Sequence, residues 1–121
     1  MNIESIVIAG AGTMGYSMAQ IFARYNYDVT IYDLKAEAIE NAQKRIKENT
    51  QILVQDQELT VEQEKQLHQH LKYTTDKACF KNCDLVVESI IEKVEIKQSF
   101  YQEISRIVKE DTILATNTSG I

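Results

Sequence analysis

Residues 3–15 read IESIVIAGAGTMG, and this stretch determines how the rest of the chain is interpreted. Residues 3–9 are rich in β-branched side chains and too few for an independent helix, which predicts a buried strand. Three of the four glycines in the chain, Gly10, Gly12 and Gly15, follow directly, in a sequence without proline. Glycine permits positive φ and close backbone approach, so this cluster indicates a specialised loop.

The residues after the glycines predict a helix and a second strand. Apolar side chains recur at helical spacing at Met14, Met18, Ile21, Phe22 and Tyr25, which is one face of a helix predicted over residues 13–25. Residues 29–33, VTIYD, then have the composition of a strand. The order strand, glycine turn, helix, strand is a βαβ unit, which is parallel and right-handed.

The remaining chain extends this unit into one α/β domain covering residues 1–121. Polar and apolar periodicity predicts an amphipathic helix over 35–55, and a capping box at Thr60 and Gln63 begins a shorter helix that reaches about His70. Further strands are predicted over 71–75, 84–89 and 112–116, with a helix over 93–109. The expected fold is a Rossmann-type doubly wound parallel sheet, with a helical hairpin inserted after the second strand and an end just past the fifth.

Composition and charge indicate which binding partners and which cell compartment to expect. The 13 basic and 18 acidic residues give a formal charge of -5, which disfavours nucleic acid and polybasic membrane binding. No apolar run approaches the ~20 residues of a membrane span, and the first four residues lack the basic region of a signal peptide. Two cysteines, Cys79 and Cys83, form no disulfide framework. We therefore expect a cytoplasmic protein.

The glycine loop predicts a dinucleotide site. In GAGTMG the first glycine makes the turn, the second lets the backbone approach a pyrophosphate, and the third permits close helix packing. Asp33 ends the second strand 21 residues after Gly12, where a carboxylate binds the adenosine ribose and repels a 2′-phosphate, so NAD is expected rather than NADP. The alternative is a structural turn with Asp33 capping the next helix. The predicted cofactor-binding loop residues are Gly10, Ala11, Gly12, Thr13, Met14 and Gly15.

Polar residues also follow the later strands. The end of the fourth strand gives Glu88 and Glu92, and the end of the fifth gives Asn117, Thr118 and Ser119. Ligands bind beyond the carboxyl ends of the strands in doubly wound sheets, which favours a site there. Asn117 and Ser119 could equally satisfy turn backbone, and Glu92 and Lys97 could be an ordinary helix-start pair.

Several blocks together resemble the start of the L-3-hydroxyacyl-CoA dehydrogenases, including the 3-hydroxybutyryl-CoA dehydrogenase branch. They are VIAGAGTMGYSMAQIFA, VTIYD, TTDKACFKNCDLVVESIIEKVEIK and DTILATNTSGI, with the helical hairpin between the second and third. That family oxidises a 3-hydroxyacyl thioester of coenzyme A, passing hydride to NAD. The resemblance implies that Glu92 and Lys97 contact the nicotinamide half of NAD, that Ser119 reaches cofactor and substrate, and that Asn117 lies beside it at the active-site mouth. The hairpin resembles the part that shelters coenzyme A.

Two departures from the family pattern matter. Gly120 stands where the family has a second serine in NTSS. The family's general base is a histidine paired with a glutamate, and both lie beyond Ile121, as does the helical domain that forms a homodimer. Hydride leaves carbon only as the hydroxyl proton is removed. We therefore expect the 121 residues to bind NAD without turnover, and to self-associate through the exposed edge of the fifth strand.

Three other hypotheses are weighed against this one. His68, His70, Cys79 and Cys83 could hold zinc, but their spacing is poor and no metal is expected. The related β-hydroxyacid dehydrogenases share a glycine loop ending in MG but commonly lack the hairpin and the NTS sequence. A noncatalytic dinucleotide-binding module has the same fold.

Overall fold

The computed structural model describes residues 2–90 and 94–116. It confirms the predicted α/β fold, with five strands, four α-helices and a 3-10 turn in the described residues. In chain order these elements are β1 (Ser5–Ala9), α1 (Thr13–Arg24), β2 (Asp28–Tyr32), α2 (Ala36–Gln55), α3 (Val61–Gln69), β3 (Leu71–Thr74), η1 (Lys77–Phe80), β4 (Leu85–Glu88), α4 (Val94–Ser105) and β5 (Ile113–Thr116).

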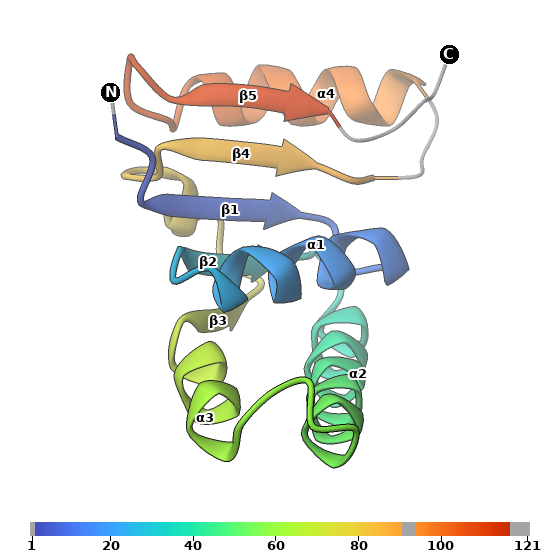
Figure 1. Ribbon diagram of the computed structural model, residues 1–121. Coiled ribbons are helices and arrows are strands. Elements are labelled where there is room, and N and C mark those ends of the chain that lie inside the picture. The colour runs from blue at the N-terminus through green and yellow to red at the C-terminus, as the bar shows by residue number, and fades with distance from the viewer. Residues whose placement is uncertain (1, 91–93, 117–121) are drawn as a thin grey trace.

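The sheet has the doubly wound order that the sequence predicts. Its strands run β3-β2-β1-β4-β5, and every neighbouring pair is parallel, so all carboxyl ends meet at one edge (Figure 1). Ile8 of β1 is paired with Ile31 of β2 on one side and with Val87 of β4 on the other. From β1 the strands are added outward to β3 on one side, and from β4 they are added outward on the other side. In such a sheet this change of side opens a crevice beyond the carboxyl ends of β1 and β4.

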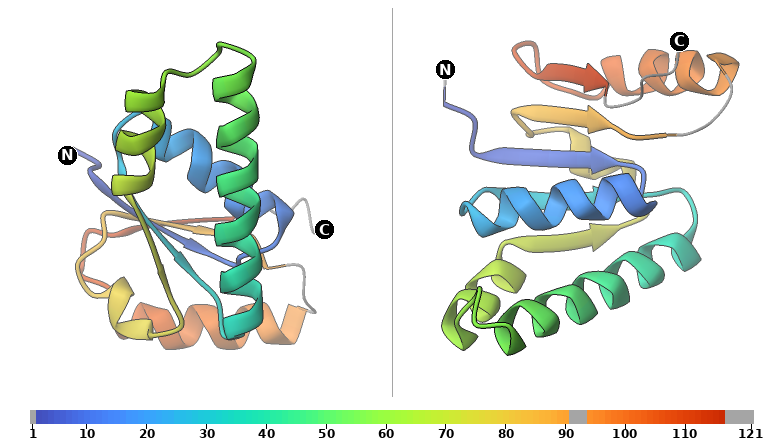
Figure 2. Two further views of the ribbon diagram at one scale, coloured as in Figure 1. Left: turned by 90° about the horizontal axis from the view of Figure 1, so that it is seen from below. Right: turned by 45° about the vertical axis from the view of Figure 1, so that its right-hand side comes forward.

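Helices cover the sheet on both faces. Figure 2 shows α1, α2 and α3 on one face and α4 with η1 on the other. The first face buries a core that includes Ile6, Ile8 and Ile31, while the second buries Val7, Phe80 and Ile104. Alternate residues of β1 thus enter opposite cores, as expected for a strand buried on both faces.

The apolar stripe of α1 is only partly buried. Gly15, Ala19 and Ala23 are buried, whereas Met14 is 45% and Ile21 is 56% exposed. Small residues let α1 lie close to the sheet, with α2 and α3 alongside it, and this close approach leaves no room for the larger side chains. Met18 and Phe22 fill the margins, half-buried against the core.

Element boundaries differ modestly from expectation. The capping box is present, with Thr60 Oγ1 accepting the Gln63 N–H and Gln63 Oε1 accepting the Thr60 N–H. Helix α4 ends at Ser105, and the Arg106 and Ile107 N–H groups that follow it bond three residues back, to the Glu103 and Ile104 carbonyls. The turn η1 was not predicted; Asp76 caps it by accepting the Ala78 N–H. Within the described ranges, no helix combines the length and apolar character needed to cross a membrane.

Candidate dinucleotide-binding site

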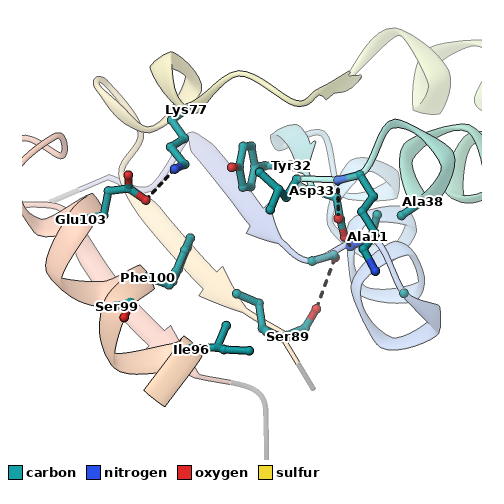
Figure 3. Close-up of a pocket in the computed structure, with 15 residues that line it drawn as sticks. Ala11, Tyr32, Asp33, Ala38, Lys77, Ser89, Ile96, Ser99, Phe100 and Glu103 are labelled. Atoms are coloured by element: carbon teal, nitrogen blue, oxygen red, sulfur yellow. Dashed lines mark hydrogen bonds and ion pairs between the residues drawn. The ribbon is translucent and has the colours of Figure 1, made fainter. Parts of the chain in front are cut away.

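A cavity of about 590 Å³ lies at the carboxyl edge of the sheet, where the sequence places the ligand site. Its walls come from the β1–α1 loop, the end of β2, η1, the end of β4 and α4 (Figure 3). These segments are far apart in the sequence, and the parallel sheet brings them together. The lining includes Gly10, Ala11, Gly12, Asp33, Ser89 and Phe100.

Two of the loop glycines are required by the fold itself. Gly10 has φ +119°, a conformation that other residues rarely adopt. A Cβ on Gly15 would lie 1.9 Å from the Gly10 carbonyl oxygen, so only glycine allows α1 to begin this close to β1. Ser89, at the end of β4, donates its hydroxyl to the Gly10 carbonyl at 3.3 Å and supports the loop from behind.

Gly12 is different, because nothing in the fold requires it to be glycine. A Cβ there would meet no atom within 4 Å, and its φ of -72° suits any residue. Gly12 precedes the first turn of α1, which has no side-chain cap and no acidic residue. The open space therefore lies at a helix N-terminus, where backbone N–H groups attract anions. This cradle fits the pyrophosphate of a dinucleotide.

Asp33 lies beside that cradle. Its Oδ2 accepts the Ala11 N–H at 2.9 Å and its Oδ1 accepts the Lys35 N–H at 2.9 Å. The carboxylate is half-buried at the cavity wall and retains further lone pairs. Asp33 therefore fixes the backbone just before α2, as expected if it has a structural function. It also lines the cavity, as a ribose-binding group requires.

The wall away from the loop includes two aromatic side chains, Tyr32 and Phe100, which both pack against the buried Phe80. Tyr32 packs edge-on against Phe80 with ring centroids 5.1 Å apart, and Phe80 packs against Phe100 at 5.8 Å. Burial raises the pKa of the Tyr32 hydroxyl. Lys77 of η1 and Glu103 of α4 form an ion pair of 2.6 Å at this end of the cavity (Figure 3).

Glu88 does not face the cavity. It is fully buried and accepts hydrogen bonds from the Ile90 N–H, from Thr116 Oγ1 at 3.0 Å and from Tyr101 Oη at 3.5 Å. One carboxylate therefore joins the ends of β4 and β5 to α4. These hydrogen bonds give Glu88 a structural function. Its position at the end of the fourth strand had suggested a ligand-binding function.

The predicted site residues are only partly gathered at the cavity. Gly10, Ala11, Gly12 and Asp33 line it, whereas Thr13, Met14 and Gly15 begin α1 just beyond. Lys97 lies half-buried on α4, outside the cavity lining. Glu92, Asn117 and Ser119 lie outside the described residues.

Sequence reasoning missed several wall residues. Tyr32 directly precedes Asp33 at the end of VTIYD, and Ser89 directly follows Glu88 at the end of DLVVES, so their positions at two strand ends could have singled them out. Lys77 and Glu103 carry no local signal, because the pair exists only when η1 and α4 meet on the same face of the sheet.

Three of the four residues considered as zinc ligands have other contacts. His68 Nε2 lies 3.0 Å from Thr50 Oγ1, His70 Nδ1 lies 3.0 Å from Asp28 Oδ1, and Cys83 Sγ donates to the Phe80 carbonyl. In the part of the chain that the structure describes, no three potential ligands gather as a metal would require.

Comparison with known proteins identifies the family. The family model described as "3-hydroxyacyl-CoA dehydrogenase, NAD binding domain" matches residues 5–121. The chain belongs to this family. The match includes the helical hairpin and the segment after β5, and it establishes NAD as the cofactor. It thereby favours the 3-hydroxyacyl-CoA dehydrogenases over the β-hydroxyacid dehydrogenases.

The relatives of this chain described below are longer proteins. A probable 3-hydroxybutyryl-CoA dehydrogenase of Deinococcus radiodurans is 38% identical over 114 residues, which are 94% of this chain and 41% of the relative. The 3-hydroxyadipyl-CoA dehydrogenase of Escherichia coli is 31% identical over the whole chain, which spans 26% of that protein. The crystal structure of (S)-3-hydroxybutyryl-CoA dehydrogenase from Ralstonia eutropha has a TM-score of 0.94 and 29% identity; the match covers 99% of this chain and 42% of that one.

Proposed function

We propose that this chain forms the cofactor-binding part of an enzyme that oxidises a 3-hydroxyacyl-CoA thioester to the 3-oxo compound. The observation that carries the proposal is the placement, in one cavity, of the open cradle at Gly12 and the carboxylate of Asp33, in a chain of the NAD-binding family. Bound NAD supplies the acceptor for the hydride that leaves the substrate carbon.

The residues of the loop and of β2 divide the binding between them. Backbone N–H groups at the start of α1 hold the pyrophosphate without a basic side chain, which suits a chain of net charge -5. Asp33 accepts hydrogen bonds from the adenosine ribose, and its charge excludes a 2′-phosphate. Ser89 and Gly15 keep the loop in this conformation.

The catalytic half of the proposal concerns residues at the other strand ends. We assign Glu92 and Lys97 to the nicotinamide half of NAD, Ser119 to cofactor and substrate, and Asn117 to the active-site mouth. Proton removal needs a base, and the described histidines, His68 and His70, lie at the end of α3 and just before β3 begins, at the amino edge of the sheet. The 121 residues are therefore expected to bind NAD without turnover.

A direct titration tests the cofactor assignment. Reduced-nicotinamide fluorescence is followed as the chain is added to NADH and, separately, to NADPH. We expect saturable binding that favours NADH and is lost in Asp33→Ala, with Asp56→Ala, which removes an exposed carboxylate at the end of α2, as the matched control. Binding of neither dinucleotide, or equal binding by Asp33→Ala, contradicts the proposal. Ordinary turnover of a 3-hydroxyacyl-CoA by these 121 residues contradicts its catalytic half.

Two further features concern assembly and compartment. Strand β5 lies at one edge of the described sheet, with Ile113 43% and Leu114 38% exposed, and such an edge favours pairing between copies. We propose that the 121 residues self-associate and that a longer protein forms a homodimer. A sharp monomer by light scattering contradicts the first proposal.

Cys79 and Cys83 are free thiols, which supports a location in the cytoplasm, and localisation of a fluorescent fusion tests this.

A further inference from the structure

The ion pair between Lys77 and Glu103 lies in the cavity but has no part in the function proposed above. The two side chains come from η1 and α4, and their charged atoms are 2.6 Å apart. They are 36% and 49% exposed, so both keep surface available to a ligand. Both line the same cavity as Gly12 and Asp33.

The position of the ribose limits where the base can lie. Pyrophosphate at the Gly12 cradle and ribose at Asp33 occupy the loop side of the cavity, so the base enters the remaining space. Figure 3 shows Tyr32, Phe100 and Ile96 around that space, with Lys77 and Glu103 at its far end. Aromatic and aliphatic walls suit the flat faces of a purine, and the charged pair is placed to meet a polar edge.

The chemistry of the pair is complementary to adenine. The 6-amino group of adenine donates hydrogen bonds, and a ring nitrogen beside it accepts one. Glu103 offers carboxylate oxygens that have lone pairs beyond the one used by Lys77, and Lys77 offers an ammonium with three donors. An acceptor and a donor thus lie side by side, in the arrangement that the adenine edge requires.

We propose that the Lys77–Glu103 pair binds the 6-amino edge of the adenine ring and that Glu103 is the specificity determinant for this base. This inference rests on the proposed dinucleotide function and adds the recognition of the base. A 6-oxo purine directs an oxygen lone pair at the Glu103 carboxylate instead of an N–H. A site that hydrogen-bonds a donor disfavours an analogue lacking it, because its own acceptor loses a partner.

The test compares NADH with reduced nicotinamide hypoxanthine dinucleotide, which has a 6-oxo group in place of the amine. We expect the wild-type chain to bind NADH about fivefold more tightly than the hypoxanthine analogue. The expected ratio is small because solvent weakens a hydrogen bond at a partly exposed site. Glu103→Gln should bind both dinucleotides with a ratio near one, because the amide can present either its oxygen or its nitrogen. Lys77→Met keeps the carboxylate and should keep the preference for NADH.

Glu110→Gln is the matched control, because it removes one negative charge from an exposed turn after α4 and should leave the ratio unchanged. Thermal unfolding of each variant reports whether the fold is retained. An unchanged ratio in Glu103→Gln overturns base recognition by Glu103 while leaving NAD binding intact. Failure of the wild-type chain to bind either dinucleotide overturns the proposed function and this inference together.

Discussion

Asp33 and Ala11 are joined by a hydrogen bond of 2.9 Å from the Ala11 N–H to the Asp33 carboxylate. The bond ties the end of β2 to the glycine loop after β1, so the side chain that we propose binds the ribose and the backbone that we propose binds the pyrophosphate are held at a fixed separation. A change at Asp33 therefore affects both parts of the dinucleotide site.

Asp33→Asn is expected to weaken NADH binding about tenfold and to reduce the preference for NADH over NADPH. The amide has one acceptor oxygen in place of two and no charge to repel a 2′-phosphate. Parallel fluorescence titrations with the two dinucleotides measure both effects. A preference equal to that of the wild type would show that the charge of Asp33 does not exclude NADPH.

Gly12→Ala and Gly15→Ala should separate ligand binding from stability. The added Cβ of Gly12→Ala meets no protein atom, so stability should change by less than about 1 kcal/mol while NADH binding is lost. The Cβ of Gly15→Ala meets the Gly10 carbonyl, and we expect a loss of about 1–3 kcal/mol. Urea unfolding and NADH titration of both variants make the comparison; NADH binding by Gly12→Ala contradicts the cradle.

Glu88→Leu should destabilise the fold by about 2–4 kcal/mol, because it removes the buried acceptor of the hydrogen bonds from the Ile90 N–H, Thr116 Oγ1 and Tyr101 Oη. Glu88→Gln retains one acceptor oxygen and should lose less. Urea denaturation measures both free energies of unfolding. A Leu variant as stable as the wild type would show that these donors find other partners.

Asp84 should govern part of the acid stability. The hydrogen bond from Lys109, with those from the Glu4 and Ser5 N–H groups, lowers the pKa of Asp84 from 3.8 to about 2. A carboxyl whose pKa is lower in the folded state stabilises the fold above its unfolded pKa, so this contribution is complete above about pH 4 and disappears as the pH falls toward 2. Urea midpoints between these pH values should change less in Asp84→Asn than in the wild type, while the exposed Asp111→Asn keeps the wild-type slope.

Both thiols should be unreactive in the folded chain. Burial raises the pKa of Cys79 to about 12 and that of Cys83 to about 11, so neither forms appreciable thiolate near pH 8. A colorimetric disulfide reagent should label them slowly in buffer and rapidly in guanidinium chloride. Fast labelling of Cys79→Ala in buffer would contradict the burial of Cys83.

The sequence predicts the parts of this fold that local chemistry determines. The βαβ unit is recognisable because glycines and Asp33 mark the ends of β1 and β2, and Thr60 with Gln63 marks the start of α3. The sequence pattern indicates the apolar side chains of α1 but not its buried face, because Gly15 and Ala19 contribute little hydrophobicity, although their small size decides how the helix packs.

The candidate site also has one part that the local sequence predicts and another part that it does not. The glycine loop and Asp33 belong to one short segment of sequence with recognisable spacing. Glu103 reaches the cavity only because α4 packs on the face opposite α1, and Ser89 reaches Gly10 only through the pairing of β1 with β4. Such long-range contacts have no periodic signal in the sequence.

The contact between Ser89 and Gly10 has a kinetic consequence. Because β4 holds the loop from behind, the glycine loop has its shape before any dinucleotide arrives and does not have to order on binding. Association should therefore be a single fast step whose rate rises linearly with NADH concentration in stopped-flow experiments. Differences in affinity among loop variants should appear mainly in the rate at which NADH leaves.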